Sequence, residues 1–292
     1  MDSIRLPSNL VSAATSEGGP RRTWLANLPT LVRALSQNWA IEVGEPYEPG
    51  GETAWVAPVR TAAGSELVLK VLWRHVEAIH EADALREWDG DGAVRLHAAE
   101  EHDDSAAMLI ERCVPGTTLA SRPELEQDAV IAALLSRLWR NPKPGHRFRP
   151  LQVMCDAWAD EFEARPTTHA TPVEPGLARE GIALFRTLPS SAPRDTLLCT
   201  DLHSGNVLAA DREPWLVIDP KPYVGDPTYD LVQHLLDRRQ RLHADPRRFA
   251  LRMAELADLD GERLLLWLFA RCVQESPVWP DLAEVARQIA PG

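Results

Sequence analysis

Three oxygen-bearing side chains follow one another at short spacing in residues 199–219, CTDLHSGNVLAADREPWLVID. Asp201 and Asn206 are five residues apart, and Asp219 stands thirteen residues further on. Phosphoryl transfer needs such a set, because an aspartate accepts the proton of the attacking hydroxyl while an amide and a carboxylate hold Mg²⁺ beside the phosphates. Asp201 is therefore the candidate base, and Asn206 and Asp219 are the candidate magnesium ligands.

The residues around these three predict a β-hairpin that returns Asp219 to the neighbourhood of Asn206. Residues 206–208 and 215–218 are short apolar runs, and the polar, turn-like residues 211–214 separate them. Protein kinases use the same order, a D-x-x-x-x-N loop followed by a metal-binding aspartate. Ordinary loop residues are the alternative, since Asp, Asn and Gly fill most turns. The buried-looking runs on both sides favour catalysis over that alternative.

The part of the chain before residue 113 has the pattern of a small β lobe. Residues 1–20 are small and polar and predict a loose N-terminal arm, while residues 24–39 carry apolar side chains at helical spacing. The order that follows is three strands, one amphipathic helix and two strands, as in the small lobe of a protein kinase. We expect the strands at 41–43, 53–59, 66–72, 93–96 and 107–111, and the helix at 76–88.

After residue 116 the pattern becomes helical, with strands only around the candidate catalytic loop. The sequence therefore predicts an α+β fold of two lobes: a nucleotide-binding lobe at 21–112, a hinge at 113–116 and a helical lobe with the acceptor site at 117–292. A length of 292 residues suits two such lobes. We expect helices at 127–139, 151–164, 175–188, 227–239, 246–256 and 261–274.

A single lysine interrupts the apolar run Leu-Val-Leu-Lys-Val-Leu at 67–72. A lysine on the third strand of such a lobe contacts the α and β phosphates, and a glutamate of the following helix holds it. Lys70 is thus the candidate phosphate contact and Glu81 its candidate partner. Glu77 stays open as the partner, because residues four apart share one helix face. A lysine that merely extends to solvent is the structural alternative.

Two further segments are candidates for nucleotide binding. Gly50 and Gly51 lie in the turn between the first two expected strands, where backbone N–H groups either face phosphates or only close a hairpin. This turn lacks the G-x-G-x-x-G pattern, so both interpretations remain. Glu111 and Cys113 follow an apolar strand at the expected hinge, and we expect their backbone to contact the adenine ring.

The charge and cysteine content of the chain indicate which partners and which cell compartment to expect. Lysine and arginine total 31 against 43 for aspartate and glutamate, so the net charge of −12 argues against binding to nucleic-acid phosphates. The acidic excess either attracts a cationic acceptor or only favours solubility. The four cysteines have no metal-site spacing and are interpreted as reduced thiols. No membrane-length apolar run and no export signal are expected, so we predict a cytoplasmic protein.

The assembled motifs resemble the aminoglycoside phosphotransferase family, in its streptomycin 6-kinase and hydroxyurea phosphotransferase branch. The resemblance covers about residues 40–275 and implies a kinase of protein-kinase-like fold, dependent on ATP and Mg²⁺, that phosphorylates a hydroxyl of a small antibiotic. Its motifs are DLHSGNVL at 201–208, WLVIDP at 215–220, GDPTYD at 225–230, HEADAL at 80–85, GAVRL at 92–96 and FARCVQE at 269–275.

Carried over residue by residue, the resemblance makes Asp201 the base, Asn206 and Asp219 the magnesium ligands, and Lys70 with Glu81 the phosphate contact. One departure is that Cys199 and Thr200 stand where family members commonly have His-Gly, so the backbone path into the loop is in question. We expect streptomycin or a related aminoglycoside as acceptor. Hydroxyurea or another small hydroxyl metabolite is the second hypothesis, and a nucleotide-binding pseudokinase is the third.

Several other polar residues have two possible roles. His203 is more consistent with a backbone hydrogen bond inside the loop than with base catalysis. Asp226 before Pro227 is typical of a helix N-cap, and Asp230 either supports the loop from below or is a solvated helix carboxylate. Four carboxylates are candidates for contacts with a cationic acceptor, or are solvated: Asp156, Asp160, Glu161 and Glu275.

Overall fold

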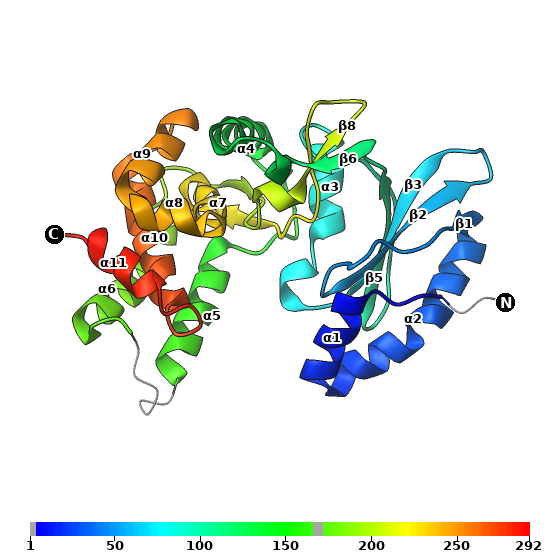
Figure 1. Ribbon diagram of the computed structural model, residues 1–292, viewed down its shortest axis with the longest axis horizontal. Coiled ribbons are helices and arrows are strands. Elements are labelled where there is room, and N and C mark those ends of the chain that lie inside the picture. The colour runs from blue at the N-terminus through cyan, green and yellow to red at the C-terminus, as the bar shows by residue number, and fades with distance from the viewer. Residues whose placement is uncertain (1–3, 166–171) are drawn as a thin grey trace. The chain divides into compact units, whose positions relative to one another are not determined.

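The computed structural model describes residues 4–165 and 172–292, and the chain divides into two compact units (Figure 1). Unit 1 comprises Met1–Gly116 together with Ala209–Pro214, and unit 2 comprises Thr117–Leu208 with Trp215–Gly292. The sequence placed the change of lobe at 113–116, next to this division. It assigned residues 209–214 to the helical lobe, whereas they group with unit 1.

Unit 1 contains a five-stranded sheet with the order β1-β2-β3-β5-β4, in which neighbouring strands are antiparallel. Strands β2 and β3 are rich in valine or leucine, and turn residues such as Gly64 separate them. The strands are β1 (Ile41–Val43), β2 (Ala54–Thr61), β3 (Glu66–Trp73), β4 (Leu96–Glu101) and β5 (Ser105–Glu111).

The two faces of β3 have different neighbours. Leu67, Leu69 and Val71 belong to the main apolar core, to which α2 contributes Trp24 and Leu28. Because successive strand residues point to opposite faces, Lys70 lies on the face away from this core. The sheet thus has the main apolar core on one face and the buried ammonium of Lys70 on the other.

The N-terminal segment is helical, which corrects the expectation of a loose arm at 1–20. Helices α1 (Ser8–Glu17) and α2 (Gly19–Asn38) follow each other, and Leu10 and Ala14 of α1 are fully buried. The sequence signal was weak because α1 is short and rich in small residues. Residues 1–3 lie outside the described part of the chain.

The expected helix at 76–88 is two elements, a 3₁₀ turn η1 (Val76–Ala78) and the helix α3 (Glu81–Trp88). Leu85 and Trp88 of α3 are buried in unit 1. The strand expected at 93–96 was placed too early: Ala93 and Val94 are buried and Ala93 forms a β-bridge, but the continuous strand β4 begins only at Leu96. A short apolar run indicates burial, but it does not show where a continuous strand begins.

Unit 2 is a set of helices around α10 (Gly261–Glu275), which packs against α5, α6, α9 and α11 (Figure 1). Close approach of α6 to α10 requires Gly181, since a Cβ there would lie 2.7 Å from Val273. The sequence missed α11. The other helices of the unit are α4 (Glu124–Leu138), α5 (Leu151–Ala164), α6 (Pro175–Thr187), α7 (Val232–Asp237), α8 (Arg239–Ala244), α9 (Pro246–Leu256) and α11 (Leu282–Gln288).

Short strands occur in the middle of the chain. β7 (Thr196–Leu198) pairs with β10 (Tyr223–Gly225), and β8 (Val207–Ala210) pairs with β9 (Leu216–Val217), both antiparallel. The remaining elements are β6 (Pro115–Thr118) and the 3₁₀ turns η2 (Leu119–Ser121), η3 (Pro189–Ser191), η4 (Ser204–Asn206) and η5 (Pro227–Leu231). Within residues 4–165 and 172–292, no helix has the length and apolar character needed to span a bilayer.

Candidate active site

The loop that carries Asp201 begins where strand β7 ends and closes on itself through hydrogen bonds. The side-chain amide of Asn206 donates from Nδ2 to the backbone oxygen of Asp201 over 3.0 Å. The backbone N–H of Asn206 donates to the oxygen of His203 over 2.9 Å, as part of the turn η4. With Nδ2 used inside the loop, the amide oxygen Oδ1 of Asn206 is the atom suited to a cation.

The predicted hairpin is confirmed, and it determines where Asp219 begins. Val207 pairs with Val217, and the backbone N–H of Ile218 donates to the oxygen of Asn206 over 2.9 Å. Asp219 comes directly after this bond with φ of 56°, a left-handed conformation that aspartate tolerates better than most residues. The backbone of the carboxylate-bearing residue is therefore adjacent to that of the amide-bearing residue.

Asp201 has a cationic neighbour that the sequence analysis did not single out. The ammonium Nζ of Lys221 lies 2.9 Å from Oδ2 of Asp201, and the two side chains are 32% and 18% exposed. Lys221 follows Asp219 by two residues, so the pair becomes visible only once the hairpin returns the chain to the loop. The run Asp219-Pro220-Lys221 was the sequence signal available.

Asp230 supports the start of the loop from a fully buried position. Its carboxylate accepts the backbone N–H groups of Cys199 and Thr200 at 2.9 and 2.6 Å, and the indole N–H of Trp139 at 2.9 Å. Burial raises the pKa of Asp230 to about 6, against the effect of these three hydrogen bonds. At neutral pH the carboxylate is ionised and holds the residues before Asp201, which confirms the supporting role.

Thr200 occupies the position where the resemblance led us to expect glycine. Its φ of 52° is left-handed, a conformation that is rare for a β-branched residue. The hydroxyl of Thr200 donates to the backbone oxygen of Lys221, and its backbone N–H is held by Asp230. The departure at Cys199-Thr200 therefore keeps a glycine-like backbone path and adds a side-chain hydrogen bond.

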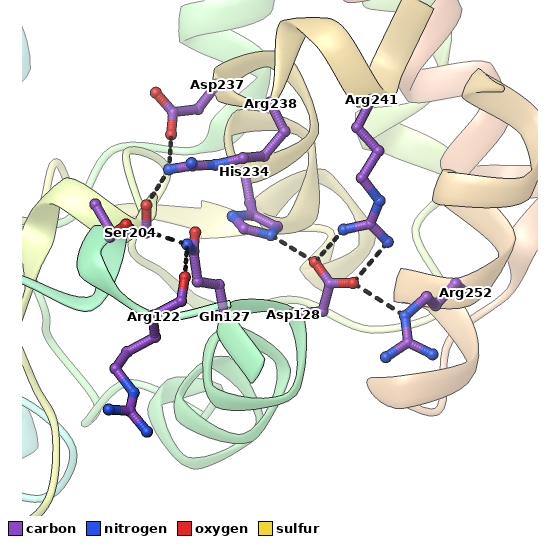
Figure 2. A network of polar contacts seen from close by, with 10 residues as sticks. Arg122, Gln127, Asp128, Ser204, His234, Asp237, Arg238, Arg241 and Arg252 are labelled. Atoms are coloured by element: carbon purple, nitrogen blue, oxygen red, sulfur yellow. Dashed lines mark hydrogen bonds and ion pairs between the residues drawn. The ribbon is translucent and has the colours of Figure 1, made fainter. Parts of the chain in front are cut away.

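The far side of the loop contacts helix α7 and the residue that follows it (Figure 2). Arg238 donates hydrogen bonds to the hydroxyl of Ser204 and to Asp237. The ring nitrogen Nδ1 of His203 accepts the N–H of Gly205 over 3.2 Å. This bond confirms the interpretation of His203 as a residue that shapes the loop.

A second buried ionic cluster joins four helices of unit 2 (Figure 2). Asp128 of α4 is fully buried and accepts two hydrogen bonds from Arg241 at 2.9 and 2.7 Å, one from Arg252 at 2.9 Å and one from His234 at 3.0 Å. Burial acts to raise the pKa of Asp128, but the hydrogen bonds overcome it and hold the pKa well below its usual range. His234 belongs to α7, and Arg238, which contacts the loop, directly follows this helix, so the cluster anchors α7 next to the loop.

In unit 1, Lys70 pairs with Glu81, as the sequence predicted. The ammonium of Lys70 lies 2.6 and 2.8 Å from the two carboxylate oxygens of Glu81, and both residues are buried. Glu81 is the first residue of α3, which is the first α-helix after the strand β3 that carries the lysine. The side chain of the alternative partner, Glu77, lies outside what the structure describes.

The turn at Gly50 and Gly51 packs against the N-terminal segment of unit 1. Gly50 has φ of 75°, and a Cβ there would lie 2.6 Å from Pro7. Asn9 donates to the backbone oxygens of Pro49 and Gly50. These contacts give the turn a structural role, and phosphate binding by its N–H groups stays a prediction.

Glu111 and Cys113 stand at the end of unit 1's sheet, where Glu111 is engaged on both sides. Its backbone N–H donates to the oxygen of Arg95 over 2.8 Å, and its carboxylate accepts two hydrogen bonds from Arg212 at 2.9 Å. Burial opposes ionisation, but these arginine contacts hold the pKa of Glu111 below its usual value. Burial raises the pKa of Cys113 to about 11, which keeps its thiol protonated. An adenine contact here stays a prediction, and the N–H of Glu111 is already used.

The four carboxylates considered for a cationic acceptor are each paired with an arginine of unit 2. Arg186 lies 2.7 Å from Asp160 and 3.6 Å from Asp156, Arg165 lies 3.3 Å from Glu161, and Arg271 lies 3.0 Å from Glu275. Arg186 also pairs with Glu163, so this one guanidinium offsets only part of the negative charge around it. Asp226 is the expected N-cap, since it accepts the N–H of Thr228 over 2.9 Å.

Known proteins are similar to this chain in sequence. The family described as aminoglycoside/hydroxyurea antibiotic resistance kinase matches residues 39–283. Streptomycin 6-kinase of Streptomyces griseus is 35% identical over 298 residues, which cover 99% of this chain and 95% of the relative. Hydroxyurea phosphotransferase of Kitasatospora aureofaciens is 35% identical over 278 residues, which cover 93% of this chain and 79% of the relative.

Solved structures with lower identity share the fold. Choline kinase LicA from Streptococcus pneumoniae matches with a TM-score of 0.57 at 13% identity, over 89% of this chain and 96% of LicA. Amicoumacin kinase hAmiN, in complex with AMP-PNP, Ca²⁺ and Ami, matches with a TM-score of 0.60 at 13% identity, over 88% of this chain and 92% of hAmiN. The expected α+β, protein-kinase-like fold is confirmed.

Proposed function

The chain belongs to the aminoglycoside/hydroxyurea antibiotic resistance kinase family and is a phosphotransferase, and we propose that it transfers the γ-phosphoryl group of ATP to a hydroxyl of streptomycin. Streptomycin 6-kinases of Streptomyces griseus and Streptomyces glaucescens, each 35% identical over more than nine tenths of this chain, support this choice of acceptor. ATP is the usual donor for such kinases and is a cytoplasmic metabolite, so we place the reaction there.

The observation that carries the proposal is the closed loop of unit 2, in which Asn206 bonds to the backbone of Asp201 and the hairpin returns the chain at Asp219. In the transfer step the acceptor oxygen forms a bond to the γ phosphorus while the bond from that phosphorus to the bridging oxygen of ADP breaks. The acceptor's proton passes to Asp201, whose Oδ1 we assign to it because Lys221 engages Oδ2.

The donor set of this loop suits a hard divalent cation. An amide oxygen and a carboxylate are ligands that Mg²⁺ prefers, and Asn206 uses its amide nitrogen within the loop. Asn206 and Asp219 would hold the ion, which when bound supplies positive charge to the phosphate oxygens. The solved hAmiN complex contains AMP-PNP and Ca²⁺, which supports use of a nucleotide and a divalent metal in this fold.

Unit 1 supplies the proposed phosphate contact. Lys70 is buried on the sheet face away from the main core, and its pairing with both oxygens of Glu81 fixes the ammonium. We assign Lys70 to the α and β phosphates of ATP, as in kinases whose third-strand lysine pairs with a helix glutamate.

Hydroxyurea is the second candidate acceptor, for a specific reason. Each of the four carboxylates that could attract a polycation is already paired with an arginine, which weakens, without removing, the argument for a strongly cationic acceptor. The relative from Kitasatospora aureofaciens, a hydroxyurea phosphotransferase, is as similar in identity as the streptomycin kinases.

Steady-state release of ADP with a panel of acceptors tests the proposal. We expect turnover with Mg²⁺-ATP and streptomycin, formation of a phosphorylated product by mass spectrometry, and no comparable rate with hydroxyurea. Preference for hydroxyurea would select the second candidate. Absence of turnover with every aminoglycoside and with hydroxyurea, by a protein that still binds ATP, would contradict both.

A further inference from the structure

The pairing between Asp201 and Lys221 is built by the backbone as well as by charge. The oxygen of Cys199 accepts two N–H groups, from Asp201 over 2.8 Å and from Lys221 over 2.9 Å. The hydroxyl of Thr200 donates to the backbone oxygen of Lys221. Two segments twenty residues apart are thus fastened together at the residues that carry the carboxylate and the ammonium.

This construction is more than an exposed ion pair requires. Lys221 and Asp201 are 32% and 18% exposed, and pairs that reach solvent contribute little to stability. Yet the backbone N–H groups of Asp201 and Lys221 and the backbone oxygen of Lys221 all have hydrogen-bond partners. Thr200, which donates to that oxygen, has a strained left-handed backbone. Strain maintained by surrounding contacts is a feature of functional sites. The arrangement therefore points to a role for the ammonium in the reaction.

The charge of the reaction identifies that role. The transferring phosphoryl group spreads negative charge over its three oxygens, and positive groups aimed at them lower the barrier. The acceptor oxygen must contact both Asp201 and the phosphorus, so the phosphoryl oxygens arrive close to the carboxylate. An ammonium 2.9 Å from Oδ2 of Asp201, on a flexible four-carbon side chain, is within reach of them.

We propose that Lys221 is a catalytic residue of this kinase: its ammonium pairs with Asp201 before the acceptor binds and contacts an oxygen of the γ-phosphoryl group during transfer. The inference rests on the proposed function. Bond formation from the acceptor oxygen to phosphorus, bond cleavage to ADP and proton transfer to Asp201 are unchanged, and Lys221 gains or loses no proton. Its contribution is positive charge at the group that moves.

Substitution of Lys221 by methionine and by arginine separates charge from shape, and the chain offers a matched control. It contains three lysines, and Lys143 is exposed in the same unit. With streptomycin and hydroxyurea as acceptors, we expect Lys221→Met to lower kcat by about 100-fold to 1,000-fold, the usual effect of removing one group that stabilises transition-state charge. The KM for ATP and the unfolding midpoint should change little. Lys221→Arg should recover much of the loss, and Lys143→Met should match the unmodified chain.

Chemical rescue provides a readout that a structural role does not affect. Propylammonium supplies the atoms missing from a Lys221→Ala variant, and we expect it to raise kcat of that variant in proportion to its concentration. It should leave the Lys143→Ala variant unchanged, and propanol, which has the same length without the charge, should have no effect.

The possible results separate the two proposals. An unmodified chain that phosphorylates no acceptor overturns the proposed function, and this inference with it. An active unmodified chain whose Lys221→Met variant keeps its kcat overturns the inference alone. A Lys221→Met variant that loses both kcat and thermal stability, and that neither Lys221→Arg nor propylammonium restores, also overturns the inference. That pattern is expected of a lysine with a structural role only.

Discussion

The backbone N–H of Thr200 donates to the carboxylate of Asp230 over 2.6 Å, while Thr200 itself has φ of 52°. A buried aspartate thus holds a β-branched residue in a left-handed conformation directly before the proposed base. The same carboxylate accepts the N–H of Cys199, so both residues in the place of the family's common His-Gly are tied to one support. The position of Asp201 depends on this support.

Asp230→Asn should lower kcat by about 100-fold, because a small displacement of a reacting group is enough for such a loss. The amide can accept with only one of its two terminal atoms, so one N–H group of Cys199 or Thr200 loses its partner in a buried place. The measurement is kcat with saturating ATP and acceptor. Asp258→Asn, at an exposed position of unit 2, is the control and should retain full activity.

Replacement of Thr200 tests whether its backbone is strained. Thr200→Gly relieves the strain of a left-handed β-branched residue, which should stabilise the folded state by about 1–2 kcal/mol. It also removes a hydrogen bond and makes the unfolded chain more flexible, and together these two effects destabilise the folded state by a similar amount. We therefore expect stability close to that of the unmodified chain in urea unfolding. Thr200→Val keeps the strain but loses the hydroxyl, and should be destabilised by about 1–2 kcal/mol. A valine variant as stable as the glycine variant would contradict this explanation.

The sequence predicted the parts of this account that depend on local pattern. The bounds of α5 and α9 matched the expectation, since a proline opens or precedes each and the apolar stripe is regular. The apolar run at 67–72 predicted the strand that carries Lys70. Helix α1 was missed because its apolar residues are few, and the strand expected at 93–96 was placed too early because an apolar run does not show where a continuous strand begins.

The missed features depend on tertiary contacts. Lys221 pairs with a residue twenty positions earlier, and this follows only from the joint path of the hairpin and the loop. Likewise, nothing in the order of residues shows that Asp128 gathers side chains from three other helices, or that Arg212 groups with unit 1 through Glu111. The site residues that the sequence could predict, such as Asp201, Asn206 and Asp219, are those whose spacing along the chain forms a motif.

The pair of Lys70 and Glu81 allows stability and activity to be separated. Because both are buried, Lys70→Met or Glu81→Leu alone breaks a buried ion pair and should destabilise unit 1 by about 3 kcal/mol or more. The double variant removes both charges of the pair and should recover most of this stability. All three variants should have strongly reduced kcat/KM for ATP. Activity that returned together with stability in the double variant would argue against phosphate binding by Lys70.

Asp128 predicts how stability changes in acid. Hydrogen bonds from His234, Arg241 and Arg252 hold its folded-state pKa below the value of about 3.9 for an unfolded aspartate, so its stabilising effect is complete above that value and declines as the pH falls further. The stability difference between the unmodified chain and Asp128→Asn should therefore be largest above about pH 5 and shrink below about pH 4. Urea unfolding between these values measures it, and a difference independent of pH would contradict the assignment.

The central claim is that Asp201 accepts the acceptor's proton beside a nucleotide held by other residues, and single-turnover phosphoryl transfer by Asp201→Asn tests it most directly. The asparagine keeps the shape of the side chain but is not a base. We predict a rate lower by about two to four decades, the usual contribution of a general base, with ATP affinity largely kept. A variant that transfers the phosphoryl group at nearly the unmodified rate would show that Asp201 does not have this role.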